Sequence, residues 1–445
     1  MNIPEKYKGK YFYHFTHIDN LASIAAHDGL YSINMQTNLN ITHHNLAIME
    51  IQQRRSKMEV SAGPGGVVHD YVPFYFATMN KMLLRLINRK VVDQPYIVFM
   101  AVPIEKILEK NVVFTDTSAN TIIPPHFYDN PNDLEKLDWN LIDFTKWVKI
   151  PDTEMHSQMA EVLVYEHVPL SWIDTYIVFD KIGETAIKNC YRNAGLDEPN
   201  ILNSWFNQRN FFFRKLMIKD EKKKEESLVT GPIQLRIKYQ LVVGNIEHKR
   251  RFIDTDKCIF SNVEDAISKI DNNFCVIKEL ADIYTLEPEK HTEVEIPTIL
   301  VIHNLPELQY YSLLNEREKN IVKLAAYFYD IGKGPKEKWE NGIEEKYLDY
   351  PADALSMLER IFSEDFEEIE YCDYRDICLL VAYSDLIFDI IDKGRNREEL
   401  NQLRLSKHEL YMLAALSEAI MSIESEVSLT ETRFKLDSFL EEITE

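Results

Sequence analysis

Four side chains in the first part of the chain have types that could together serve glycosyl-transfer chemistry. An arginine presents a fork that matches the oxygens of a pyrophosphate, and an aromatic ring can stack on a flat base. A histidine can hold the nucleotide side, and one carboxylate can hold a ribose hydroxyl while an oxocarbenium-like sugar forms. In chain order the residues of these types are His14, Arg55, Tyr75 and Glu161. Such a set of groups suits ADP-ribosyl transfer from NAD.

Each of these residues alone has an ordinary structural explanation. His14 could be a half-buried histidine whose hydrogen bonds are satisfied, and Tyr75 could belong to the core. Arg54 and Arg55 could form the solvated end of a helix, where the helix dipole favours positive charge. Glu161 could be a charge that keeps an edge strand from aggregating. Only the four together, in this order, favour a functional interpretation.

Short strands and helices that alternate irregularly must position these residues. Apolar and aromatic runs predict six strands, and apolar residues at helical spacing predict three helices. The expected strands are 11–15, 71–77, 96–102, 112–114, 161–165 and 176–179, and the expected helices are 18–25, 45–57 and 81–89. Because these do not form regular strand–helix–strand units, the predicted class is α+β and not a doubly wound sheet.

Several longer stretches around these residues match sequence motifs of one toxin family. They are YHFTHIDNLASI (13–24), the paired arginines before GPGGVVHDYVPFYFA (63–77), Met82-Leu83, VVFTDTSAN (112–120) and AEVLVYEHVP (160–169). With them, residues 11–180 closely resemble the DarT family, toxins that ADP-ribosylate DNA. The resemblance implies a small ADP-ribosyltransferase core that uses NAD to modify a base, commonly thymidine, in single-stranded DNA. It also implies a toxin–antitoxin or phage-defence role, opposed by a DarG-like macrodomain antitoxin.

The family's site residues carry over by their positions in these motifs. The resemblance makes Glu161 the catalytic glutamate, which would hold the ribose and accept the proton of the attacking base. It makes Arg55 a catalytic residue that contacts NAD, with Arg54 as the register alternative. The other cofactor-binding positions that it implies are His14 and Thr16 for the nucleotide, Tyr75 beside nicotinamide and Met82 near the site.

Two departures from the family concern residues that bear on the choice of target. The family's VPFYFAPRSPML reads VPFYFATMNKML at 72–83, and Ser118 stands where some members have histidine. The loop 117–158 should face the substrate, and its aromatic side chains could stack on unpaired bases or simply pack. These aromatic residues are Phe127, Trp139 and Trp147. ADP-ribosylation of RNA or protein therefore stays open as an alternative.

A basic stretch interrupts an otherwise acidic chain. The 445 residues include 72 acidic and 50 basic ones, for a net charge of −22, which repels nucleic acid on average. Between positions 209 and 251, however, 12 basic residues meet only five acidic ones. Basic residues interleaved with aromatic ones suit contact with a nucleic-acid strand, and a charged linker is the alternative. The residues predicted to contact DNA are Arg214, Lys215, Lys222, Lys223 and Lys224.

The last part of the chain is predicted to be helical. Residues 324–334, LAAYFYDIGKG, resemble the signature of HD domains except that Tyr329 replaces the histidine. His303 and Asp385 stand where such domains place further ligands. Because a neutral phenol is a poor ligand for a divalent metal, we expect a degenerate HD-like module without a metal. An HD-type phosphohydrolase or nucleotide-binding regulator is the alternative function for the whole chain.

Composition completes the prediction. An apolar share of 45% is enough for hydrophobic cores and excludes a mostly disordered chain. Five cysteines without a CxxC pair argue against a disulfide framework. Without a signal peptide or a long apolar run, the expected location is the cytoplasm, with no membrane contact. The predicted domains are 1–215 for the transferase, 216–295 for a basic linker and a small α/β segment with strand-like runs at 233–243 and 274–277, and 296–445 for the helical HD-like domain.

Overall fold

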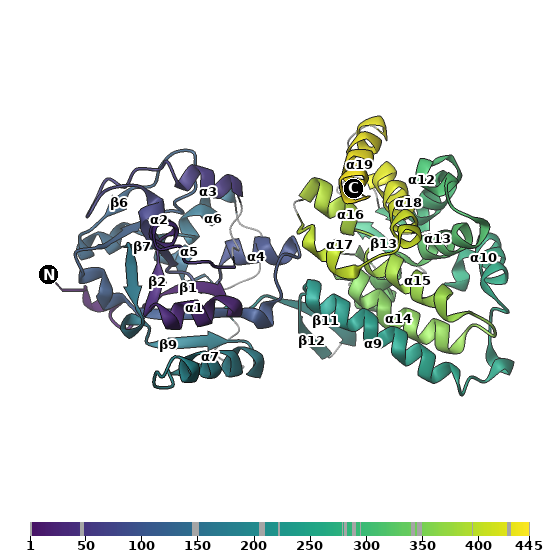
Figure 1. Ribbon diagram of the computed structural model, residues 1–445, viewed down its shortest axis with the longest axis horizontal. Helices are drawn as coiled ribbons and strands as arrows, with labels where there is room; N and C mark the ends of the chain where they lie inside the picture. Colours follow the sequence, from purple (N-terminus) through teal and green to yellow (C-terminus); the bar gives the residue numbers. More distant parts are fainter. Residues whose placement is uncertain are drawn as a thin grey trace. The chain divides into compact units, whose positions relative to one another are not determined.

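The chain forms two compact units, which are drawn in Figure 1. The first unit comprises residues 1–87 and 92–213, and the second comprises residues 88–91 and 214–445. Each has its own hydrophobic core. The computed structural model describes residues 2–44, 49–144, 151–203, 210–220, 223–277, 279, 283–286, 291–293, 295–339, 343–344, 349–393, 395–424 and 429–444.

An eight-stranded sheet forms the centre of the first unit. In spatial order its strands are β10 (Ile201–Leu202), β9 (Thr175–Val178), β4 (Ile97–Pro103), β1 (Tyr11–His17), β3 (Tyr71–Tyr75), β7 (Glu161–Tyr165), β5 (Val112–Thr115) and β6 (Phe127–Tyr128). All neighbouring pairs are antiparallel except β10 and β9. Strands β1, β3 and β7 therefore lie side by side in the middle of the sheet, although they are far apart in the sequence.

The central strands form because their residues are β-branched, aromatic or apolar and fit a buried pleated surface. Every residue of β4 except the last is buried. Phe12 of β1 and Phe74 of β3 meet edge to face, with ring centroids 5.1 Å apart. The six strands expected from the sequence are present, and the predicted mixture of a sheet with flanking helices is confirmed.

Short helices flank this sheet and accompany a two-stranded ribbon. The helices are α1 (Leu21–Ala26), α2 (Ile33–Asn38), α3 (Met49–Arg55), α4 (Lys81–Asn88), α5 (Trp139–Ile142), α6 (Asp152–Gln158) and α7 (Lys181–Asn193), and the ribbon pairs β2 (Gly29–Tyr31) with β8 (His167–Pro169). A side chain caps α4, the helix that carries Met82. Asn80 Oδ1 accepts hydrogen bonds from the amides of Met82 and Leu83, which fixes the start of α4.

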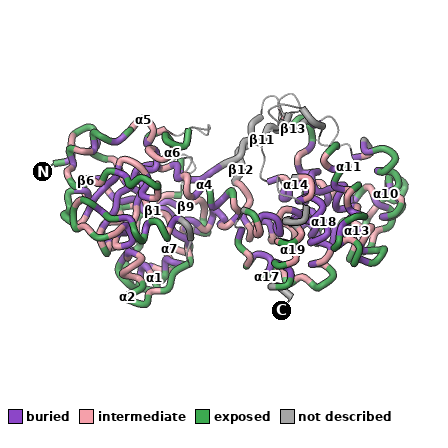
Figure 2. The backbone as a smooth tube through the Cα atoms, turned by 90° about the horizontal axis from the view of Figure 1, so that it is seen from above, coloured by how far each residue is buried: buried purple, intermediate pink, exposed green. Residues whose placement is uncertain are grey.

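Helices make up most of the second unit, as the sequence predicts for the carboxy-terminal part. They are α9 (Pro232–Arg250), α10 (Val263–Asn272), α11 (Glu295–Asn304), α12 (Gln309–Ser312), α13 (Glu316–Phe328), α14 (Tyr350–Glu364), α15 (Tyr371–Ala382), α16 (Leu386–Phe388), α17 (Glu398–Leu403), α18 (Lys407–Glu424) and α19 (Leu429–Thr444). The strands are the hairpin β11 (Arg214–Asp220) and β12 (Lys223–Leu228) and a small sheet of β13 (Tyr284–Leu286), β14 (His291–Glu293) and β15 (Ile343–Glu344). Figure 2 shows that buried residues gather along α14 and α18. No described helix is long and apolar enough to cross a membrane.

Two strand-like runs predicted in the middle of the chain are wrong. Residues 233–243 belong to helix α9, and residues 274–276 form a single 3-10 turn. The run 233–243 is rich in β-branched residues, but Pro232 occupies the first helical turn and Leu235, Val242 and Ile246 are buried at helical spacing. The charged segment expected as a linker forms the β11–β12 hairpin in its described residues.

Candidate active site

Three adjacent strands bring predicted site residues together in the first unit. Glu161 is the first residue of β7 and lies opposite Tyr75, the last residue of β3. Tyr75 in turn pairs with Tyr13 of β1, the neighbour of His14. The strand register therefore gathers residues from three distant parts of the sequence into one region.

Arg55 and Glu161 form a buried ion pair at this place. The Nη1 atom of Arg55 lies 3.0 Å from both carboxylate oxygens of Glu161, and Nη2 lies 3.0 Å from Oε2. The two residues are only 6% and 1% exposed. Burial lowers the pKa of Arg55, but the charge and hydrogen bonds of Glu161 more than offset this, so the pKa of Arg55 lies above its usual value. Arg54, the register alternative, is exposed on the same helix.

Backbone and hydroxyl groups fix the orientation of this carboxylate. The amide of Ala119 donates to Glu161 Oε1 at 2.7 Å, and the carbonyl of Ala119 accepts from Arg55 at 3.4 Å. The amide of Glu161 donates to the hydroxyl of Thr115 at 3.0 Å, and this hydroxyl donates to the carbonyl of Thr117. The loop that follows β5 thus holds Glu161 from two sides.

Tyr75 and Met82 meet beside the ion pair. The Tyr75 hydroxyl donates to Met82 Sδ at 3.7 Å, and Asn80 holds Met82 at the start of α4. Burial, with a smaller contribution from the charge of Glu161, raises the pKa of Tyr75 above its usual value. The phenol therefore stays neutral at physiological pH.

His14 and Thr16 complete the wall of a cavity next to these groups. His14 Nδ1 donates to the carbonyl of Pro73 at 2.8 Å, and burial lowers the pKa of His14, so the ring is neutral. The Thr16 hydroxyl accepts from Asn20 Nδ2 at 2.9 Å. One cavity is lined by His14, Thr16, Arg55, Tyr75 and Met82 together with Asn120. Glu161 is not among its lining residues. Its carboxylate is bound by Arg55 and by the amide of Ala119.

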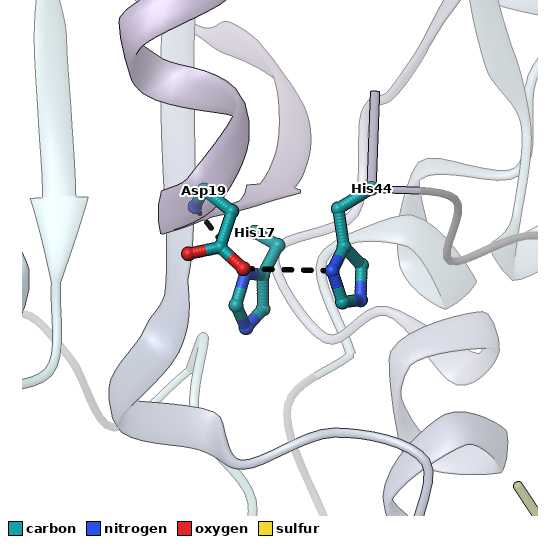
Figure 3. A group of neighbouring side chains, drawn as sticks. All are labelled: His17, Asp19 and His44. Atoms are coloured by element: carbon teal, nitrogen blue, oxygen red, sulfur yellow. Dashed lines mark hydrogen bonds and ion pairs between the residues drawn. The ribbon is translucent and has the colours of Figure 1, made fainter. Parts of the chain in front are cut away.

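A stacked pair of histidines, absent from the sequence-based prediction, holds the chain at the edge of this cavity. The rings of His17 and His44 are stacked 4.3 Å apart at 13°. Their Nδ1 atoms lie 3.1 and 3.5 Å from the same oxygen of Asp19 (Figure 3). Asn20 adds a donor to the His44 carbonyl at 3.0 Å and an acceptor for the His44 amide at 2.6 Å.

This histidine cluster holds two segments of the chain together. Its nitrogen and carboxylate oxygen atoms lie within 4.8 Å of one another, a spacing that a metal ion could also use. Both Nδ1 atoms lie next to the same oxygen of Asp19. Burial lowers the pKa of His17, and the charge of Asp19 only partly offsets this. The cluster therefore connects the end of β1 to the segment that precedes α3 and Arg55.

A second contact missing from the sequence-based prediction supports the loop that holds Glu161. The Ser118 hydroxyl lies 2.9 Å from His156 Nδ1 and 2.9 Å from Asn120 Oδ1. The Ser118 amide also donates to the carbonyl of His156 at 3.0 Å. Helix α6 thus braces the loop that carries Ala119 and Asn120, and an imidazole lies beside Ser118.

The aromatic residues expected along the substrate wall have different surroundings. Trp139 packs between Tyr7 and Phe76, with ring centroids 4.8 and 5.3 Å away, and its indole N–H donates to the carbonyl of Leu134. Ordinary packing therefore accounts for Trp139. Phe127 packs against a small buried cluster that includes Val113 and Leu163, and Trp147 lies outside the described residues.

The predicted DNA-contacting residues belong to the second unit. Their backbones lie in β11 (Arg214 and Lys215) and β12 (Lys223 and Lys224), and Lys222 lies outside the described residues. These strands pair in an antiparallel hairpin. They are therefore not part of the cavity that brings the other predicted residues together.

Lysine and arginine side chains already hold the acidic groups of the HD-like segment. Asp330 pairs with Lys333 at 3.0 Å. Asp385 pairs with Lys90 at 3.1 Å and with Arg395 at 3.0 Å. Although burial raises the pKa of Asp385, these two cations lower it to about 2. Tyr329, in the position of the HD histidine, is buried. The two carboxylates are thus neutralised by cationic side chains.

Comparison with known proteins relates the first unit to characterised enzymes. A family model described as "ssDNA thymidine ADP-ribosyltransferase, DarT" matches residues 13–213. The DNA ADP-ribosyl transferase of Thermus sp. (strain 2.9) is 30% identical over 181 residues, which are 40% of this chain and 85% of that protein. The solved structure of Thermus sp. 2.9 DarT in complex with ADP-ribosylated ssDNA is 27% identical and matches 46% of this chain and 97% of its own, with a TM-score of 0.40. The same protein in complex with NAD+ is 25% identical and matches 45% and 97% of the two chains, with a TM-score of 0.38.

Proposed function

The chain belongs to the DarT family of single-stranded-DNA ADP-ribosyltransferases, and on that premise we propose how its first unit transfers ADP-ribose from NAD to a base in single-stranded DNA. It is an NAD-dependent enzyme of this class. One observation carries the proposed mechanism: a buried carboxylate, Glu161, is held by Arg55 beside a cavity that His14 and Tyr75 also line.

The side chains around the cavity fit the successive parts of NAD. His14 and Thr16 would hold the nucleotide, since each keeps a polar atom beside the cavity. The guanidinium of Arg55 matches a pyrophosphate. The ring of Tyr75 would lie against nicotinamide, with Met82 packed behind its hydroxyl.

Arg55 links co-substrate binding to activation of the carboxylate. Its guanidinium binds Glu161 through Nη1 and Nη2, and its Nε–H lies outside these bonds. We infer that the pyrophosphate of NAD also takes an Nη donor, which weakens the bonds to Glu161 and frees one of its oxygens for the ribose hydroxyl. The amide of Ala119 keeps the other oxygen in place. Glu161 is then oriented to accept the ring N–H proton of the attacking base.

The target we propose is thymidine in single-stranded DNA, as in the description of the matching family. The changed loop at 72–83 and Ser118 leave RNA and protein as outcomes that an experiment must separate. The purified chain should be incubated with labelled NAD and separate pools of single-stranded DNA, duplex DNA, RNA and protein. We expect label in the single-stranded DNA pool, mainly on thymidine-containing oligonucleotides. Label in RNA or protein alone would overturn the proposed substrate.

Further roles follow from the same family and remain proposals. We propose that a DarG-like macrodomain antitoxin opposes this chain as a toxin in the cytoplasm. The β11–β12 hairpin, with Arg214, Lys215, Lys222, Lys223 and Lys224, would add contacts to the DNA backbone. The helical unit would act as a structural or ligand-sensing HD-like module without hydrolysing nucleotides.

A further inference from the structure

Two isoleucines project from the loop that holds the catalytic carboxylate. Ile122 and Ile123 are 90% and 81% exposed, more than any other large apolar residue among those that the structure describes. Isolated exposed apolar residues are common, but two adjacent isoleucines without a partner cost solubility. Their position therefore calls for an explanation beyond packing.

The loop around these isoleucines is held by its own hydrogen bonds. The Thr121 hydroxyl lies 2.6 Å from the carbonyl of Ile123 and 3.4 Å from that of Ser118. At the other end, His126 binds Asp116 through its amide at 3.0 Å and through its ring at 2.7 Å. Two prolines, 124 and 125, restrict the backbone between these anchors. The apolar tip is thus held outward by a braced loop.

This tip follows, within a few residues of the chain, the residues that contact Glu161 and the cavity. Ala119 binds Glu161 directly, and Asn120 lines the cavity. The tip follows Ala119 by three to four residues, which a fully extended chain would span in at most about 14 Å. We therefore expect the neighbours of a target base at Glu161 to come within reach of Ile122 and Ile123.

We propose, on the basis of the proposed function, that Ile122 and Ile123 form a wedge that unstacks the target base from its neighbour. Apolar side chains inserted between base steps are a common way for proteins to separate them. An enzyme that modifies a base must expose that base before it can react. The exposed residues beside the tip in the chain are the apolar Pro124 and the polar His126. Two isoleucines and one proline form a patch far smaller than the surface of about 800 Å² per partner that a stable protein interface buries. A stacked base step matches its size better.

The test compares the double variant Ile122→Ser/Ile123→Ser with the wild type on two oligonucleotides. One carries the target base between purines, which stack strongly, and the other carries it between abasic sites. On the purine-flanked strand we expect kcat/KM to fall about 10- to 100-fold. Stacking of one base changes an equilibrium constant by a factor of about this size. On the abasic strand the variant should stay within about threefold of the wild type. NAD binding, followed as a thermal shift, should be unchanged.

Two controls make the result specific. Ile182→Ser, at an exposed site on α7 beside the opposite edge of the sheet, should leave both rates unchanged. Ile122→Phe/Ile123→Phe, which keeps an apolar tip, should retain activity on the purine-flanked strand. Equal losses of the serine variant on both strands, or no loss on either, would overturn the wedge while the proposed function stands. A wild-type chain that labels no DNA would overturn the proposed function and the wedge with it.

Discussion

Glu161 is buried as a charge because Arg55 and the Ala119 amide meet its two oxygens. Removing a whole partner from such a pair leaves the other charge uncompensated, at a cost of about 3–5 kcal/mol. A glutamine keeps the shape and one acceptor oxygen but cannot accept the proton of the base. The role of this residue is therefore best tested with an amide in place of the carboxylate.

The first prediction concerns Glu161→Gln. We expect transfer to DNA to fall by at least about 10³-fold, because the group that stabilises the transition state and takes the proton is gone. The melting temperature should fall, because the neutral amide leaves the buried charge of Arg55 uncompensated, so the rates are compared at a temperature at which both chains are folded. Glu109→Gln, at an exposed site of the same unit, is the matched control and should retain full activity. Incorporation of label by Glu161→Gln within tenfold of the wild-type rate would show that another residue is the base.

The second prediction concerns His14 and pH. Burial lowers the pKa of His14 in the folded chain, whereas the unfolded chain binds a proton below about pH 6.5. Stability from the neutral ring is therefore present above this pH and is lost as pH falls toward the lower folded pKa. We expect the melting temperature to drop between pH 7 and pH 5, and His14→Gln to show a smaller drop. Parallel curves for the two chains would contradict this assignment.

At the scale of elements, the strands were predictable and part of the middle of the chain was not. Buried strands such as β4 and β7 are short apolar runs, and these have few other interpretations. Residues 233–243 also read as a strand because β-branched residues are frequent there. They form helix α9 since the burial of Leu235, Val242 and Ile246 follows a helical period that tertiary packing selects.

The residues of the candidate site were also predictable only in part. His14, Arg55 and Tyr75 stand in motifs and could be predicted. The pairing of His44 with Asp19 and of His156 with Ser118 joins residues that lie far apart in the chain, and no motif contains both partners. Contacts of this kind depend on how loops return to the sheet, which local sequence does not determine.

The third prediction concerns the β11–β12 hairpin. Replacing Lys222, Lys223 and Lys224 by glutamine should weaken binding of single-stranded DNA and flatten its dependence on salt, because each phosphate contact releases counterions. Affinity should be measured across a range of salt concentrations. A control chain with Lys8, Lys57 and Lys110 replaced by glutamine, all exposed in the first unit, removes the same charge elsewhere. An unchanged salt slope in the hairpin variant, or an equal change in both chains, would remove the hairpin from the DNA-binding surface.

At the scale of the whole molecule, the distribution of charge argues against a DNA-binding or metal-binding role for the carboxy-terminal part of the chain. Residues 301–445 carry a net charge of −16, so this part of the chain repels DNA on average. Its two candidate metal-binding acids, Asp330 and Asp385, already pair with lysine and arginine. A divalent ion would have to displace these cations from buried sites.

The fourth prediction is that the full chain needs no divalent metal. EDTA should leave ADP-ribosyl transfer unchanged, and Mg²⁺ or Mn²⁺ should not produce hydrolysis of nucleotides, because Tyr329 replaces the HD histidine and cationic side chains already hold Asp330 and Asp385. Release of phosphate in a coupled assay is the measurement. Metal-dependent hydrolysis that Asp330→Ala abolishes would reveal a second catalytic centre.

The second unit is built from two separate stretches of the chain, 88–91 and 214–445. Lys90, from the short stretch, supplies one of the two cations that hold the buried carboxylate of Asp385. A gene that ended or began near residue 213 would therefore encode a helical unit in which Asp385 has lost Lys90. Recombination could not exchange the second unit by a single crossover, because its coding sequence lies at two separate places in the gene.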